Sequence, residues 1–200
     1  MGILSSSVAV TRYLVLGKPK EPFLENVREA LARHAVRDID GQTDVKTVGW
    51  AGFEKHFASS FDPEHLATGE YLAFCLRVDK KSLPGKVVRK NMSLAAAKKL
   101  AETNRQFLAK EEKKDLREQV EAMLLTKIPA VPSVYDVLWD LTEDEVWLFS
   151  TQKAAKEEFE TLFNKSFGLA LVPLFPYTLA ENKLKLSVTE MDKITALAAK

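Results

Sequence analysis

Apolar and polar residues alternate along several short stretches of the chain, as they do in β-strands with one buried face. Within residues 70–78 an apolar side chain recurs at every second position, so these side chains share one face of a strand. Residues 134–141 alternate in the same way, and residues 142–144 then form the turn of a predicted hairpin. The predicted strands are residues 8–16, 45–50, 70–78, 134–141, 145–150 and 169–174.

Two further segments place apolar residues three or four positions apart, which predicts amphipathic helices. The first begins at Pro22 and covers residues 22–35. The second covers residues 153–166 and ends before Gly168, because glycine often terminates a helix. Residues 51–69 show no period and are predicted to be irregular, and the tail from residue 184 to 200 has weak helical character.

Residues 85–127 contain no proline and, after Gly85, no glycine. They are rich in strong helix formers, but the segment is too long for one helix of a compact domain. We therefore predict either two helices or one long helix with a bend, breaking near residues 110–114, and the apolar stripe of the second part suits an antiparallel hairpin. The second helix has a narrow apolar stripe formed by Leu116, Val120, Met123 and Leu124. With so little apolar surface to bury, the hairpin is expected to project.

These elements predict an α+β fold with mostly antiparallel sheets, packed helices and a projecting helical hairpin. The predicted domains are an N-terminal lobe over residues 1–83, the hairpin over 84–129 and a second lobe over 130–200. With 46% hydrophobic and 28% charged residues the composition is that of a soluble globular chain, which argues against disorder. A single cysteine excludes an intrachain disulfide, and we expect a cytoplasmic protein with no membrane span.

The net charge of +1 conceals a strongly basic segment. Residues 80–114 hold eleven lysines and arginines and three glutamates, a net charge of +8, so the remaining chain carries −7. A basic arm on an acidic body would orient a polyanion toward the arm. Lysine and arginine bind phosphates without reading sequence. The candidate phosphate contacts are Lys86, Arg89, Lys90, Lys98, Lys99, Arg105, Lys110, Lys113 and Lys114.

The basic segment also has interpretations that involve no nucleic acid. Its charges could serve only to keep a helical hairpin soluble. Phe107, near the bend, could stack on a base, insert into a partner's pocket or pack between the two helices. If the hairpin instead docks on a second copy of the chain, the candidate interface residues are Phe107, Leu116, Val120, Met123 and Leu124.

Signals for an enzyme are mostly missing. The eight glycines form no phosphate-cradling motif, and the three histidines are too scattered for a zinc motif. Cys75 lies in an apolar strand and is interpreted as a buried structural thiol. Asp136 and Asp140 share a strand face and could hold metal ions for a nuclease, whereas the acids in residues 143–144 lie in a turn where solvated carboxylates are common.

Several short motifs follow one another between the first strand and residue 174. They are Val48-Gly49-Trp50, Asp79-Lys80-Lys81, Leu83-Pro84, the stretch 111–120, Leu124-Leu125, Lys153-Ala154-Ala155 and Val172-Pro173-Leu174. In this order and spacing they resemble the RdgC family of bacterial recombination-associated proteins. The resemblance covers most of the chain.

The resemblance implies a DNA-binding protein without catalysis. Members of the family form ring-shaped dimers that encircle duplex DNA, bind with little sequence preference, associate with the nucleoid and restrain a RecA-type recombinase. Some carry an exonuclease label without a recognised catalytic motif. By position, residues 85–127 would correspond to the family's projecting finger, which contributes to dimer closure. Longer members continue well beyond residue 174, so we expect ring closure to differ here.

The sequence thus supports three hypotheses. The first is a sequence-independent, non-catalytic DNA-binding protein that acts in recombination or replication, forms a homodimer, is associated with the nucleoid and needs no cofactor. The second is a metal-dependent exonuclease that uses Asp136 and Asp140. The third is an interaction module whose hairpin docks on a partner or a second copy.

Overall fold

The computed structural model describes residues 2–18, 21–57, 61, 66–182, 186, 187 and 190. Its contacts divide the chain into two compact units. Unit 1 comprises residues 1–36, 48–77 and 134–200, and unit 2 comprises residues 37–47 and 78–133. The predicted hairpin, residues 84–129, falls within unit 2.

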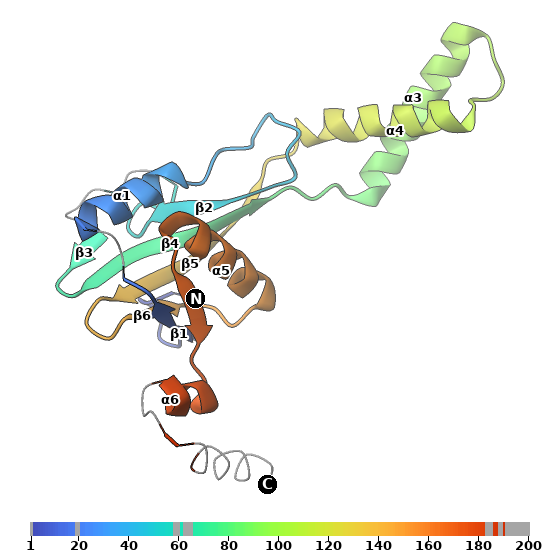
Figure 1. Ribbon diagram of the computed structural model, residues 1–200. Coiled ribbons are helices and arrows are strands. Elements are labelled where there is room, and N and C mark those ends of the chain that lie inside the picture. The colour runs from blue at the N-terminus through green and yellow to red at the C-terminus, as the bar shows by residue number, and fades with distance from the viewer. Residues whose placement is uncertain are drawn as a thin grey trace. The chain divides into compact units, whose positions relative to one another are not determined.

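Seven strands of the described chain form one sheet in the order β2-β4-β5-β6-β1-β7, with β3 paired to β4 (Figure 1). The strands are β1 (Thr11–Leu16), β2 (Lys46–Gly52), β3 (Ala67–Thr68), β4 (Tyr71–Lys80), β5 (Val131–Asp140), β6 (Glu145–Leu148) and β7 (Ala170–Pro173). β1 runs antiparallel to both β6 and β7, and β5 runs antiparallel to β6. The helices and the antiparallel sheet confirm the predicted α+β class.

The predicted strands are present, with shifted ends. β1 begins at Thr11 instead of residue 8, and β5 begins at Val131 and includes Pro132. β4 is buried on both faces, since Ala73 and Cys75 are as inaccessible as the alternating large residues. A short helix, α6 (Pro176–Asn182), was not predicted, and the predicted helical tail lies largely outside the described residues.

Unit 1 has an aromatic core between its sheet and two helices, α1 (Phe23–Arg33) and α5 (Lys153–Phe167). α5 lies across one face of the sheet (Figure 1). Phe159 and Phe163 are fully buried, and Phe163 packs 5.1 Å from Trp139 of β5. Phe23 of α1 meets the same tryptophan edge-on at 5.5 Å. Aromatic pairs at these distances stabilise the core beyond the effect of their buried area.

Gly49 on β2 allows a close approach of two backbone segments. The N–H of Val36 donates to the carbonyl of Trp50 (3.0 Å), and the N–H of Trp50 donates to the carbonyl of His34 (2.9 Å). A Cβ atom at position 49 would overlap the backbone nitrogen of Val36. Glycine is therefore required in the Val48-Gly49-Trp50 motif for a packing reason.

Unit 2 contains the helical hairpin, formed by α3 (Gly85–Thr103) and α4 (Lys110–Leu125). Of the two predicted alternatives, two helices are present, but the predicted break near residues 110–114 is wrong, because residues 104–109 form the connection. Asn104 ends α3 in the left-handed conformation (φ 52°), which asparagine tolerates better than most residues. The lysines at 110–114 instead lie in the first turns of α4.

The core of the hairpin is small. Val88 of α3 packs with Val120 and Leu124 of α4, and Leu83, Met92 and Ala95 cover this cluster. Most other side chains of α3 are exposed or half-buried. The hairpin therefore combines a narrow apolar contact with a large polar surface.

We expect Gly49→Ala to lower the free energy of unfolding by about 1–3 kcal/mol, because the added methyl group must displace a backbone segment. Gly85→Ala is the matched control, since a Cβ at that helical position meets nothing within 4 Å. Chemical denaturation of both variants provides the measurement. Equal stability of the two variants would contradict the packing role of Gly49.

Candidate nucleic-acid interface

Exposed basic side chains lie along both helices of the hairpin. On α3, Lys86, Arg89 and Lys90 are exposed and occupy neighbouring positions of one helical face. Lys98 lies two to three turns further on, with 79% of its side chain exposed and Glu102 at 3.9 Å. Lys99 is half-buried. Lys86 and Lys98 are about 18 Å apart along the helix axis, since each residue adds about 1.5 Å.

On α4 the basic residues form one stripe. Lys110, Lys113 and Lys114 are exposed and are spaced so that they share a face of the helix. Arg117 continues this stripe with 66% of its side chain exposed, while it donates to Glu121 at 2.7 Å. The sequence prediction omitted Arg117 because it lies outside the most basic segment, although its helical spacing from Lys110 could have identified it.

Arg105 differs from most of the other candidate contacts because its guanidinium forms a close ion pair. Its guanidinium donates to Glu112, and the second oxygen of Glu112 accepts the N–H of Ala109 (2.9 Å) just before α4 begins. The hydrogen bond from Arg105 lowers the pKa of Glu112, and the Ala109 N–H adds to the effect. This contribution to stability is thus present at neutral pH and is lost as acid protonates Glu112.

The candidate interface residues divide into two groups. Leu116, Val120 and Leu124 are at most 8% exposed, and the last two pack against Val88 of α3. Met123 is 39% exposed, and Phe107 is 79% exposed. This exposure shows that Phe107 does not pack between the two helices. The residue belongs to the connection between Thr103, the end of α3, and Lys110, the start of α4.

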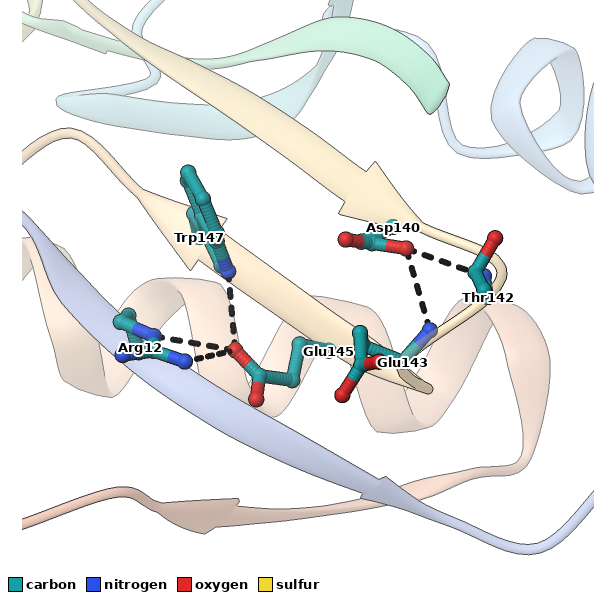
Figure 2. Close-up of polar contacts among 6 residues, drawn as sticks. All are labelled: Arg12, Asp140, Thr142, Glu143, Glu145 and Trp147. Carbon is teal, nitrogen blue, oxygen red and sulfur yellow. Dashed lines mark hydrogen bonds and ion pairs between the residues drawn. The ribbon is translucent and has the colours of Figure 1, made fainter. Parts of the chain in front are cut away.

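The acidic residues proposed for a nuclease site have structural partners. The carboxylate of Asp140 accepts the backbone N–H groups of Thr142 and Glu143 and so closes the β5–β6 turn (Figure 2). Across the ladder from Asp140 lies Glu145, which is 1% exposed. One oxygen of Glu145 accepts hydrogen bonds from Arg12 (2.6 and 2.9 Å) and Trp147 (3.0 Å). Glu143 and Asp144 are exposed in the turn, as expected.

Asp136 lies four positions before Asp140 on β5, and its carboxylate contacts the thiol of Cys75. The thiol donates to one oxygen of Asp136 at 3.4 Å, and the N–H of Ile3 donates to the other at 2.8 Å. His56 Nδ1 lies 3.5 Å from the sulfur. Burial raises the pKa of Cys75, and the neighbouring carboxylate raises it further, so the group remains a thiol. Cys75 is fully buried, which confirms the predicted burial.

A comparison with protein-family models matches residues 14–187 to the family described as "Putative exonuclease, RdgC". The matched segment contains the whole hairpin and all seven strands except the first residues of β1. The chain belongs to the RdgC family. Membership of the RdgC family supports a role related to recombination.

No three histidine, cysteine, aspartate or glutamate side chains within the described ranges come together as ligands for a metal ion. In the same part of the chain, no helix combines the length and the apolar character that a bilayer span requires.

Arg12 stabilises the sheet by pairing with the buried Glu145, and its guanidinium carbon also lies 5.6 Å from the centre of the Trp147 ring. We expect Arg12→Met to cost about 2–4 kcal/mol of stability, because it leaves a buried carboxylate without its cation. Lys153→Met is the control, since its pair with Glu157 is exposed and contributes less than about 1 kcal/mol. Urea denaturation measures both variants. If both variants lose the same free energy of unfolding, the pair between Arg12 and Glu145 stabilises the sheet no more than an exposed pair does.

Proposed function

We propose that this chain is a DNA-binding protein that acts in recombination or replication without catalysis. It binds duplex DNA independently of sequence, through the exposed basic side chains of the hairpin. The observation that carries this proposal is the set of exposed cations on α3 and α4. Within the described part of the chain, no ion pair is formed by Lys86, Arg89, Lys90, Lys110, Lys113 or Lys114.

Unpaired, exposed lysines are suited to phosphates. Each lysine that neutralises a phosphate releases condensed counterions, so affinity falls as salt rises. Such contacts fix the position of the protein on the duplex and carry no information about sequence. Lys99 and Arg105 are weaker candidates, because the first is half-buried and the second already pairs with Glu112.

The same surface accounts for the cellular role that we propose. A cytoplasmic protein that coats duplex DNA without sequence preference would be found on the nucleoid. By occupying DNA it would restrain a RecA-type recombinase that needs the same substrate. RdgC-family membership supports the connection with recombination.

The test is duplex binding across a salt series. We expect the triple variant Lys110→Gln, Lys113→Gln, Lys114→Gln to bind more weakly and to reduce the slope of log affinity against log salt by up to about 3, since each contact contributes about 0.9. The control triple variant is Lys55→Gln, Lys153→Gln, Lys165→Gln, which changes three exposed residues of unit 1. It removes the same charge and should keep the wild-type slope.

Two results would reject the proposal. One is an affinity for duplex DNA that is insensitive to salt or equal in the two triple variants. The other is degradation of end-labelled duplex by pure protein with magnesium or manganese, which would favour the exonuclease hypothesis instead.

A second proposal concerns self-association, and it rests on the exposed apolar residues of the hairpin. Beside the hairpin core lies a groove of about 370 Å³, whose apolar lining is formed by Leu94, Ala95, Leu116, Val120 and Met123. Leu94 is 62% exposed, and Phe107 of the same hairpin is 79% exposed. A two-fold dimer would let Phe107 of each copy fill the groove of the other, because such dimers pair one surface with itself.

We expect Phe107→Asp to shift the chain toward monomer in sedimentation, and to leave the melting temperature unchanged only at concentrations where the wild type is also monomeric. The reason is that the side chain is exposed in a single copy and is buried only on association. Phe175→Asp is the control, as Phe175 is 52% exposed and belongs to unit 1. A wild-type chain that is monomeric at high concentration would exclude the homodimer.

A further inference from the structure

Lys81 belongs to the basic segment 80–114, but it is buried and so not accessible to DNA. It directly follows β4 and is only 4% exposed, which is unusual for lysine. Its ammonium donates to the backbone oxygens of Gln42 (2.8 Å) and Leu125 (2.9 Å). Its own N–H donates to the carbonyl of Val45 (2.8 Å). Lys81 therefore connects the end of β4, the segment that holds Gln42 and Val45, and the end of α4, all within unit 2.

The contact with Leu125 supplies what α4 lacks. Leu125 is the last residue of the helix, where carbonyl groups have no partner within the helix and carry partial negative charge. α4 has no basic residue in its own last turn. The ammonium of Lys81, 44 positions earlier in the chain, thus acts as the cation at this helix end.

The contact with Gln42 joins the helix end to the segment before β2. Asp40 in that segment accepts the N–H of Ala130 at 2.8 Å, and Ala130 lies just beyond α4. The two bonds of the Lys81 ammonium and the bond from Ala130 to Asp40 therefore hold residues 39–45 against the end of α4 and the chain that follows it. The apolar core of the hairpin is small, so polar contacts at its base carry more of its stability.

We propose that Lys81 is a positioning residue for the DNA-binding hairpin: it anchors the base of α4 and makes no phosphate contact itself. This inference rests on the proposed function for its consequence in DNA binding, but the anchoring is testable separately. Removing the ammonium leaves the carbonyl of Leu125 without its donor in a buried contact, and an unsatisfied buried polar group is destabilising. The hairpin would then be formed correctly in only a fraction of molecules.

The experiment compares Lys81→Met with Lys80→Met, which removes the same charge from the adjacent exposed position. In Lys81→Met we expect faster amide hydrogen exchange at residues 126–128, which bond back to the end of α4. We also expect a duplex affinity reduced by about three- to tenfold, because apparent affinity scales with the competent fraction. The salt slope should stay at the wild-type value. Lys80→Met should leave exchange unchanged.

The outcomes separate the anchor from the proposed function. A salt slope lowered by about 1 in Lys81→Met would show a phosphate contact and overturn the proposal. Equal exchange in the two variants would overturn it as well. If the wild type binds no DNA, the proposed function fails, while the exchange result still decides the anchor.

Lys81→Arg is the second variant, for use if Lys81→Met does not fold. It keeps a cation and its donors in a larger side chain. Because the guanidinium is larger than the ammonium that this buried site holds, the proposal predicts faster exchange at residues 126–128 together with weaker duplex binding, and wild-type values of both would overturn it. Wild-type affinity together with faster exchange at these residues would overturn it.

Discussion

The sheet of unit 1 depends on a cluster of aromatic side chains that a single helix presents to several strands. Phe159, Phe163 and Phe167 recur every fourth residue on α5, so they form one continuous ridge. Trp50 of β2 contacts the first and third of these rings, and Trp139 of β5 contacts the second and third. Strands from both sides of the hairpin in the sequence are thus held by one helix. The hairpin is in consequence an insertion within a sheet that already has its own core.

The hairpin is organised by different physics. Its apolar contact is limited to a few residues around Val88, Val120 and Leu124, so little of its surface is needed for its own folding. The remaining helix faces are free to carry charge without the cost of burying it. Polar contacts at the two ends compensate for the small core. Glu112 bonds to the backbone where α4 begins, and Lys81 bonds to it where α4 ends.

Periodicity was sufficient for most elements of the fold and insufficient for the sites. The alternation in β4 and the ridge on α5 follow from burial, which acts on whole segments. The hairpin break does not, because residues 110–114 and their neighbours are all good helix formers, and the left-handed Asn104 alone ends α3. Phe107 was equally beyond sequence reasoning, since an aromatic residue near a helix bend is usually covered. Lys81 gave no signal at all, because burial of a lysine depends on carbonyl groups brought by distant segments.

The basic residues of the segment 80–114 do not all act on DNA in the same way, because some of them are buried or paired. Long-range attraction of a polyanion depends on net charge, so all eleven basic residues of the segment 80–114 contribute to it. Counterion release depends instead on side chains that can reach a phosphate. Lys81 is buried and Arg105 is paired with Glu112, so both add to the first effect and little to the second. The basic composition of the hairpin therefore sets how DNA would be attracted, whereas the exposure of individual lysines sets how many contacts it can make.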